Sequence, residues 1–462
     1  MDNRTNIHFR GLENRPNLGL LKLAIPLVVA FSIQTGFNVV DTIFVGRLGP
    51  DAIAGLSIAY PFQMMMYAIG GGLGIGAQSL ISRFIGANDP ESARYAVYNS
   101  VILAAICTFF TVTIGLFGVG YIVSLFGAPN EVNSFSLEYL YVVISGSVFL
   151  YLMLSMDAML RGEGNTRLSM YFMGFSAILN LVMDPFFIFT LDMGVRGAAI
   201  ATVLARAIVS SYMCYYIFVK KRYFIEVSLG KIKYSFETIR HIVGIGIPAS
   251  MTQLSYSLSL FAMNTILATY GGVAIAAFGI GFRIESMAFL PMFGMAGAFV
   301  SAVGYFRGSG QYHKMLGLKN FAYGSTIVFM SLCALVFFLF PETIYGIFTS
   351  SPEVISLGRD YLLINVLVYP LVPFTSISAA GFQGLGRGHP PFLIALLRSW
   401  LIVIPLSWFF AFHTGQGITF IWWSMVIGNT VSALIGGIWF FVGTKRFKAG
   451  IGTDNFYKKD FI

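Results

Sequence analysis

Long apolar blocks, separated by short polar stretches, constrain this chain more than any other feature of its sequence. Hydrophobic residues make up 56% of the 462 residues and only 11% are charged, whereas an ordinary soluble domain has about 25% charged residues. The blocks run for about 20 residues, which is the length that a helix needs to cross the hydrocarbon core of a bilayer. They are apolar throughout rather than on one face only. The sequence therefore predicts an all-α polytopic membrane protein.

Twelve such blocks are predicted to be membrane spans, in two sets of six. The first set lies near residues 22–46, 53–82, 97–119, 138–160, 168–190 and 197–219, and the second near 245–269, 273–305, 320–345, 360–383, 391–412 and 419–443. With the N-terminus placed inside, the predicted outer loops hold only three basic residues, Arg47, Arg196 and Arg359. Most of the other lysines and arginines fall in the tails and inner loops, as the positive-inside rule requires. We therefore expect a multi-pass protein of the cell membrane with both termini in the cytoplasm.

The net charge of +9 would suit a nucleic-acid partner, but its placement in the inner loops makes it a signal of topology, so no nucleic acid is expected. The most basic stretch, residues 220–240, could contact anionic lipid, although a solvated linker is the simpler interpretation. All three cysteines lie inside apolar blocks and the five histidines are scattered, which indicates neither disulfides nor a zinc or haem site. The polar N-terminal residues 1–19 do not have the pattern of a cleavable signal peptide, and no cofactor is expected.

The two sets of spans are copies of one another. A single offset of 222 residues aligns them without a gap over a long stretch, and the pairs that support it include Pro26 and Pro248, Gly49 and Gly271, Gly72 and Gly294, Gly86 and Gly308, and Tyr139 and Tyr361. Because six is an even number, both copies enter the membrane in the same orientation, related by an axis along the membrane normal. We predict an N-terminal lobe at residues 1–220, a cytoplasmic linker at 221–244 and a C-terminal lobe at 245–462, which suits alternating access.

The stretch DAMLRGEGNTRL, residues 157–168, is predicted to be the inner joint between the fourth and fifth spans. Its two glycines have partners in a twin loop of the second lobe, so they are expected to end a helix and allow a tight turn. The stretch lacks the GxxxxGK[ST] spacing of a phosphate-binding loop and follows a helix rather than a strand. Arg161 and Arg167 are expected to anchor the inner face of the membrane.

Four stretches give the chain a resemblance to a known family. They are DTIFVGRLGPDAIAGLS (41–57), GIGAQSLISRFIGANDPESAR (74–94), LRGEGNTRLSM (160–170), and NLVMDPFFIF together with MGVRGAAIAT (180–202). With the twelve spans and the repeat, they resemble the multidrug and toxic compound extrusion (MATE) family over nearly the whole chain, and most of all its DinF-type branch. The resemblance implies a V-shaped pair of six-helix lobes and a cation-coupled antiporter that exports amphipathic, often cationic, organic compounds. Another branch of the family has acids in the seventh and tenth spans. Here the seventh span has none, and the one acid of the tenth, Asp360, lies at its outer end.

Ionisable side chains inside a span are costly unless they are paired or neutralised, so they mark candidate functional sites. Asp41 in the first span and Asp184 in the fifth lie at similar depths near the predicted outer side, and Thr202 of the sixth span reaches the same layer. Asn180 lies one helical turn from Asp184. Two neighbouring carboxylates in a medium of low dielectric constant do not easily both keep their charge, so one takes a proton or the two share a cation. Oxygen ligands suit a proton or a hard cation such as Na+.

The resemblance implies that Asp41, Asn180, Asp184 and Thr202 form the coupling-ion site, for H+ or Na+, and no other metal site is expected. The alternative is a static hydrogen-bond network that holds the lobe together. The repeat argues against this alternative, because the second lobe has methionine and leucine at the two acid positions.

Candidate substrate contacts also lie in the N-terminal lobe. Gln34 and Asn38 share one polar stripe of the first span with Asp41. Met173 lies two turns before Asn180, and methionine adapts to varied apolar ligands. Arg206 lies near the middle of the sixth span and needs a partner from another span.

Two further residues have competing interpretations. Asp157 lies one turn before Arg161, so an ion pair within the helix is the simpler account. The family resemblance suggests instead that Asp157 faces the cavity and attracts cations. Pro26 removes a backbone hydrogen bond and permits a kink. In related transporters a bend at the matching proline is linked to protonation of the aspartate, so Pro26 is a candidate gate, but it could equally be architectural.

Three classes of function are consistent with a membrane protein of this kind. The first is a secondary active antiporter, expected to act as a monomer on small drug-like molecules, with H+ or Na+ as the coupling ion. The second is a flippase for lipid-linked oligosaccharides of the same superfamily, which would line its cavity with several basic residues. Here only Arg206, Arg283 and Arg398 lie within spans, which favours export of drug-like compounds. The third is a membrane-bound transferase, whose acid or histidine motifs are not found.

Overall fold

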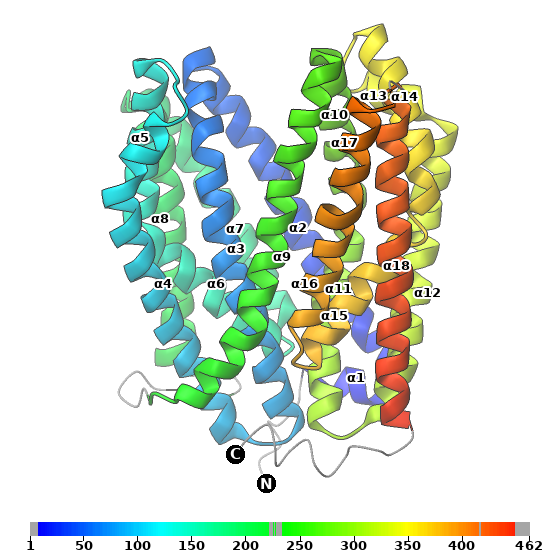
Figure 1. The fold of residues 1–462 in the computed structure, drawn as a ribbon. Coiled ribbons are helices and arrows are strands. Elements are labelled where there is room, and N and C mark those ends of the chain that lie inside the picture. Colours follow the sequence, from blue (N-terminus) through cyan, green and yellow to red (C-terminus); the bar gives the residue numbers. More distant parts are fainter. Residues whose placement is uncertain (1–7, 221–224, 226, 228–232, 415–416, 449–462) are drawn as a thin grey trace.

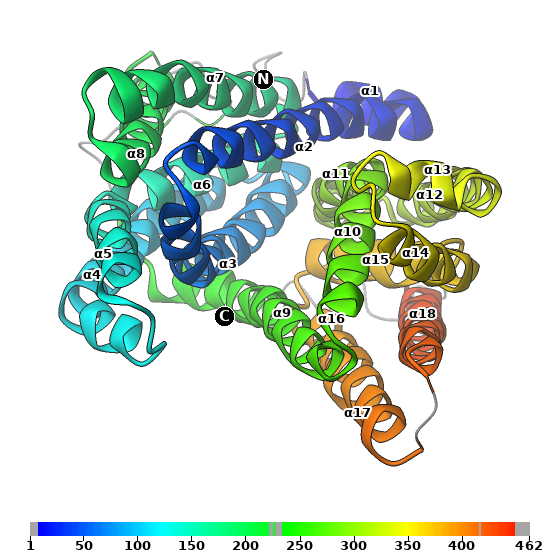
Figure 2. The ribbon, with the colours of Figure 1, turned by 90° about the horizontal axis from the view of Figure 1, so that it is seen from above.

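A computed structural model of the chain describes residues 8–220, 225, 227, 233–414 and 417–448. In these residues the chain is helical, and they contain no strand. The helices form two bundles that lie side by side, one built from the first half of the chain and one from the second (Figure 1; Figure 2). The predicted all-α polytopic fold is therefore confirmed.

The first bundle, called the N lobe, comprises α1 (Arg10–Asn14), α2 (Pro16–Gly46), α3 (Pro50–Gly86), α4 (Pro90–Ser124), α5 (Asn130–Ser145), α6 (Ser147–Gly162), α7 (Thr166–Pro185), η1 (Phe186–Thr190), α8 (Gly194–Cys214) and η2 (Tyr215–Val219). The second bundle, called the C lobe, comprises α9 (Phe236–Leu267), η4 (Ala268–Tyr270), α10 (Gly272–Ala288), α11 (Leu290–Gly308), α12 (Tyr312–Leu339), α13 (Pro341–Gly346), α14 (Pro352–Asn365), η5 (Val366–Val368), α15 (Val372–Gly384), α16 (His389–Leu396), η6 (Leu397–Val403), α17 (Ile404–Phe412) and α18 (Thr419–Lys448).

The described residues hold eight helices that are long and apolar enough to cross a membrane, or eleven if each bent pair is one span. The seventh predicted span, near 245–269, lies in α9, a helix of 32 residues that is not among these eleven. This helix begins at Phe236 rather than near 245, so the end of the predicted linker at 221–244 is helical. Residues 221–224, 226 and 228–232 of that linker lie outside the described residues.

Three predicted spans are bent rather than straight. The α5–α6 pair turns by 53° at Gly146, the α10–α11 pair by 49° at Phe289, and the α14–α15 pair by 56°. Proline occupies the first turn of α11 and of α15, where its missing N–H costs no hydrogen bond and a new helix starts readily. Hydropathy is blind to such breaks, which is why the sequence predicted single helices at 138–160, 273–305 and 360–383.

Glycines related by the repeat bring the two lobes into contact. α3 packs against α9, and α2 packs against α11. A Cβ added at Gly72 of α3 would lie 2.5 Å from the Ser250 amide nitrogen of α9, and one added at Gly294 of α11 would lie 2.9 Å from the Val28 amide nitrogen of α2. Ser250 and Val28 are themselves repeat partners. The same glycine-to-backbone contact therefore occurs twice across the pseudo-symmetric interface.

The lobes share a hydrophobic core at one end only. Leu80 near the end of α3 and Phe299 of α11 belong to a core that crosses between the lobes, whereas the cores around Tyr151 and Trp422 each stay within one lobe. At the opposite ends of the helices, a Cβ added at Gly49 or Gly271 would meet nothing within 4 Å. The lobes thus meet at the end that the charge distribution predicts to be cytoplasmic.

The short helix α1 lies across this closed end and contacts the C lobe (Figure 1). Phe9, just before α1, is buried and stacks on Tyr305 of α11 with ring centroids 4.3 Å apart. The Tyr305 hydroxyl donates to Glu13 Oε1 at 2.6 Å, and Lys314 Nζ donates to the Glu13 carbonyl oxygen at 3.0 Å. The sequence did not predict α1, because five residues in a polar stretch carry no clear helical periodicity.

Candidate functional site

Three helices of the N lobe bring together the four residues that the sequence predicted as a coupling-ion site. Asp41 comes from α2, Asn180 and Asp184 from α7, and Thr202 from α8. Asn180 Nδ2 donates to Asp184 Oδ1 at 2.6 Å, and Thr202 Oγ1 donates to Asn180 Oδ1 at 3.4 Å. Asp184 is 0% exposed, Asn180 4% and Thr202 8%. The polar layer inferred from span depth therefore exists as a connected, buried network.

The Asp41 carboxyl group approaches Asp184 from the neighbouring helix, and the two groups lie within hydrogen-bonding reach of each other. Asp41 Oδ1 and Asp184 Oδ2 are both buried and have no hydrogen-bond donor within the described part of the chain. A carboxylate is only an acceptor, so two of them can join in a hydrogen bond only if one carries a proton. An added proton or a small cation would thus satisfy both orphan oxygens at once.

The local sequence explains why the acids reach this position. Pro185 follows Asp184 directly, and α7 gives way there to the π-helical turn η1, as expected where proline removes an N–H from the helical ladder. Gly197 lets α8 lie against that turn, because a Cβ at this position would be 2.6 Å from the Phe187 carbonyl oxygen. The proline and the glycine together place Thr202 beside Asn180.

Arg206, one turn after Thr202, has its partner in another helix, as its isolated charge required. Its Nη2 donates to the Tyr67 hydroxyl of α3 at 2.9 Å, and the guanidinium lies 5.4 Å from the centre of the Tyr67 ring. Nearby, Gln63 Nε2 donates to the Tyr139 hydroxyl of α5. Sequence analysis missed Gln63 and Tyr67 as site residues. The one feature of the sequence that pointed to this cluster was Tyr139, which has a repeat partner in Tyr361.

The remaining predicted substrate contacts line the same lobe. Gln34 and Asn38 of α2 are hydrogen-bonded to each other at 3.4 Å. Asn38 is exposed, whereas Gln34 and Met173 are half-buried. Their roles as substrate contacts stay predictions. Pro26 is buried inside α2, which continues as one helix from Pro16 to Gly46, so its role as a gate is likewise a prediction.

Asp157 is engaged within its own lobe. Its Oδ2 forms an ion pair with Arg161 Nη2 at 2.8 Å, and its Oδ1 accepts a hydrogen bond from Ser169 of α7. The residue is 5% exposed. The pairing predicted from the four-residue spacing is present, and it draws Arg161 into the interior. Arg161 is half-buried in this pair, whereas Arg167 is exposed, and their role as anchors of the inner membrane face stays a prediction.

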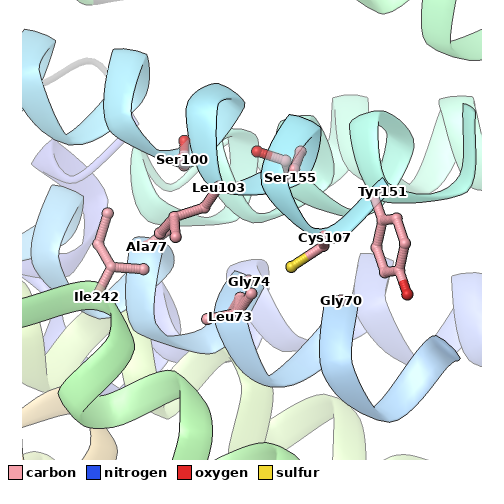
Figure 3. A pocket seen from close by; sticks show the side chains of 11 residues that line it. Gly70, Leu73, Gly74, Ala77, Ser100, Leu103, Cys107, Tyr151, Ser155 and Ile242 are labelled. Carbon is pink, nitrogen blue, oxygen red and sulfur yellow. The ribbon is translucent and has the colours of Figure 1, made fainter. Parts of the chain in front are cut away.

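A separate cavity lies between α3, α4 and α6 of the N lobe and α9 of the C lobe (Figure 3). None of the residues around it is charged; they are Gly70, Leu73, Gly74, Ala77, Ser100, Leu103, Ala104, Cys107, Tyr151, Ser155 and Ile242. The cavity therefore lacks the groups that would hold an ion, and it shares no residue with the Asp41 and Asp184 network.

Apolar helices arranged in two pseudo-symmetric lobes, with a buried pair of acids inside one lobe, define a membrane transporter and not an enzyme. The chain belongs to the MatE family. The model of that family matches twice, at residues 26–186 and at residues 248–409. The two matches begin at the repeat partners Pro26 and Pro248, as the internal duplication requires.

Individual relatives agree with this assignment. The chain is 29% identical to the "Probable multidrug resistance protein NorM" of Thermotoga maritima, with 88% of each chain covered. It is 26% identical to the "Multidrug export protein MepA" of Staphylococcus saprophyticus, over 90% of this chain and 91% of that one. A solved structure described as the outward-facing conformation of a multidrug resistance MATE family transporter superimposes with a TM-score of 0.92 at 30% identity, over 96% of this chain and 99% of the other. The DinF-type branch within the family stays a prediction.

Proposed function

We propose that this protein is a secondary active antiporter that exports amphipathic, often cationic, organic compounds in exchange for H+ or Na+. The observation that carries the proposal is the pair of buried carboxyl oxygens on Asp41 and Asp184 that have no donor among the residues that the structure describes. A group that gains or loses a cation inside a transporter lobe changes the charge of that lobe, which is what coupling to an ion gradient requires. The names of the relatives as multidrug resistance and export proteins support the choice of substrate class.

The coupling ion binds at the outer part of the N lobe. With the site empty, Asp41 and Asp184 repel each other and attract a cationic compound to the lobe. Binding of a proton or Na+ neutralises one of the two charges. This removes the repulsion between the acids and also weakens the attraction of the lobe for the compound. The ion and the compound therefore exclude each other without direct contact. The half-buried Asp41 provides the route by which the ion reaches the fully buried Asp184.

Alternating access follows from the two-lobe architecture. The lobes meet through close glycine contacts at the predicted inner end, so the compound leaves toward the outside in this arrangement. Opening toward the inside requires these contacts to separate while others form at the outer end. Pro26 lies in α2, which carries Asp41 and also packs against α11 of the other lobe. A bend at Pro26 would therefore link the charge of the site to the packing of the lobes.

The test is efflux of ethidium and norfloxacin from a host that lacks its own pumps. Asp41→Asn and Asp184→Asn should each lower efflux by about tenfold or more, equivalent to at least about 1.4 kcal/mol of lost coupling. The matched control is Glu131→Gln, the same loss of charge at an exposed acid in the first turn of α5, which should leave efflux unchanged. Equal resistance from wild type and Asp41→Asn would contradict the proposal. If neither the wild type nor Asp41→Asn confers resistance, and the wild type alters the level of lipid-linked oligosaccharides, the flippase alternative would be favoured.

A further inference from the structure

We propose that Glu285, in the C lobe, is a second exchangeable proton site of this transporter. The proposal rests on the antiport function proposed above. It adds a second titratable site, in the other lobe, which consists of one glutamate and neighbouring tyrosines instead of two aspartates. Glu285 lies in the last turn of α10, within a predicted span, and is half-buried.

The internal repeat singles out this residue. Glu285 is the repeat partner of Gln63, and Tyr361 is the repeat partner of Tyr139. In the N lobe, Gln63 donates to the Tyr139 hydroxyl. In the C lobe, Glu285 lies near the Tyr361 hydroxyl, but the hydroxyl that donates to the acid is that of Tyr369. The duplicated architecture therefore holds a neutral amide in one lobe and an acid in the other, at equivalent positions of the repeat.

The surroundings of Glu285 leave one polar group unsatisfied. The Tyr369 hydroxyl donates to Glu285 Oε1 at 3.1 Å. The Tyr361 hydroxyl is 0% exposed and completes no hydrogen bond of ordinary length in the part of the chain that the structure describes. A phenol hydroxyl can donate to an ionised carboxylate or accept from a protonated carboxyl group, so Tyr361 can pair with Glu285 in either protonation state and the site accommodates both.

No fixed charge neutralises Glu285. The groups that face it from other elements are Tyr256 of α9, Tyr345 of α13, Tyr361 of α14, Tyr369 after η5, and Arg398 of η6. Tyr345 is used elsewhere, since its hydroxyl donates to the Ala277 carbonyl oxygen at 2.9 Å.

Arg398 is the one cation among these facing groups. Its Nη1 donates to Asn429 Oδ1 at 3.4 Å, and its guanidinium lies 5.4 Å from the centre of the Tyr256 ring. Among the described residues, no ion pair joins it to Glu285, unlike the Asp157 and Arg161 pair. Because no described residue forms an ion pair with it, the half-buried acid is able to take up and release a proton.

The position of Glu285 connects protonation to shape. It lies one turn before the 49° bend between α10 and α11, and its partner Tyr369 lies at the 56° bend between α14 and α15. The Phe289 ring at the first bend also contacts the Tyr369 ring, with centroids 5.2 Å apart. An ionised carboxylate accepts the Tyr369 hydrogen bond about twice as strongly as a neutral acid does. Proton uptake (H+ plus carboxylate giving the carboxylic acid) therefore loosens the contact that joins the two bends.

The chain contains a built-in reporter for this event. All five tryptophans lie in the C lobe, at Trp400, Trp408, Trp422, Trp423 and Trp439. Trp422 is fully buried and packs edge-on against Tyr361, with ring centroids 5.0 Å apart. Intrinsic tryptophan fluorescence thus reports on the surroundings of Glu285 and contains no signal from the N lobe.

The experiment is a pH titration of tryptophan fluorescence in the purified full-length protein, with Asp41→Asn and Asp184→Asn together removing the N lobe acids. We expect a transition in this background that Glu285→Gln abolishes and Trp422→Phe greatly reduces. Tyr369→Phe keeps the acid but removes a donor to its charged form, so the transition should move to higher pH. Glu342→Gln, at an exposed C lobe acid paired with Arg359 at 3.3 Å, is the matched control and should change nothing.

A transition that persists in Glu285→Gln, or no transition in the background that retains Glu285, would overturn the proposal. So would a Tyr369→Phe midpoint equal to that of the parent protein. The titration uses no substrate, so its failure is distinguishable from failure of the efflux test.

Discussion

At the scale of single residues, the buried acids of the N lobe fall into two kinds. Asp157 pairs with Arg161 in a short ion pair, whereas Asp41 and Asp184 face each other with two oxygens that have no donor among the described residues. A paired charge has no reason to exchange a cation, whereas an unsatisfied pair has one. On the proposed function, this distinction separates the structural acid from the two coupling acids within one lobe.

The first prediction concerns Asp157. Because Asp157→Asn leaves the Arg161 guanidinium without its counter-charge in a largely buried place, we expect a loss of stability of about 3 kcal/mol. Thermal unfolding of the detergent-solubilised protein measures it, with Glu131→Gln as the control for a carboxylate-to-amide change at the surface. An unchanged unfolding temperature combined with lost efflux would show instead that Asp157 acts on the substrate path.

The sequence predicted which residues form the buried layer, but not their partners. Asp41, Asp184 and Thr202 could be placed at one depth because helical rise converts position in a span into distance from its end. Tyr67 as the partner of Arg206, and Tyr369 as the partner of Glu285, depend on how helices rotate against each other. That rotation is decided by side-chain packing across the bundle and leaves no pattern in a single span.

At the scale of elements, helix breaks and glycine contacts determine the geometry. The number and location of apolar segments followed from hydropathy, but the bends at Gly146 and Phe289 did not, because an apolar block scores equally whether straight or broken. The repeat was more informative. The pairing of Gly72 with Gly294 in the alignment reappears as two equivalent contacts between the lobes.

The second prediction tests one of these contacts. Gly72→Ala places a Cβ against the backbone of α9, which cannot move aside as a flexible side chain could, so we expect a loss of stability of about 1–3 kcal/mol. Gly71→Ala is the matched control, since a Cβ there meets nothing within 4 Å. Thermal unfolding of the two variants gives the comparison, and equal unfolding temperatures would show that the lobes do not pack through Gly72.

At the scale of the whole molecule, the proposed alternating access requires the closed end of the lobes to open. α1 lies across this end, and Gln311 Nε2 of the C lobe donates to Glu13 Oε1 of α1 at 3.5 Å. On that mechanism, the contacts of Phe9 and Glu13 with α11 and α12 break each time the inner side opens, so that α1 would act as a latch on the closed end of the two lobes.

The third prediction locks this latch. In a protein whose native cysteines are replaced, Glu13→Cys with Gln311→Cys should be joined by a short bifunctional methanethiosulfonate reagent, which binds each cysteine through a disulfide that reduction breaks. Efflux should then fall to near background and recover on reduction, while either single variant keeps its efflux under the same treatment. Full efflux by fully cross-linked protein would show that α1 remains in place throughout the cycle.

The central claim is that Asp41 and Asp184 exchange a cation for the exported compound. Its most direct test is transport of ethidium by purified protein in liposomes, with a proton gradient or a sodium gradient imposed separately. We predict that one of the two gradients drives the compound in the opposite direction to the ion, and that Asp41→Asn and Asp184→Asn each abolish this movement while Glu131→Gln does not. Gradient-driven transport that continues after both acids are replaced would contradict the account.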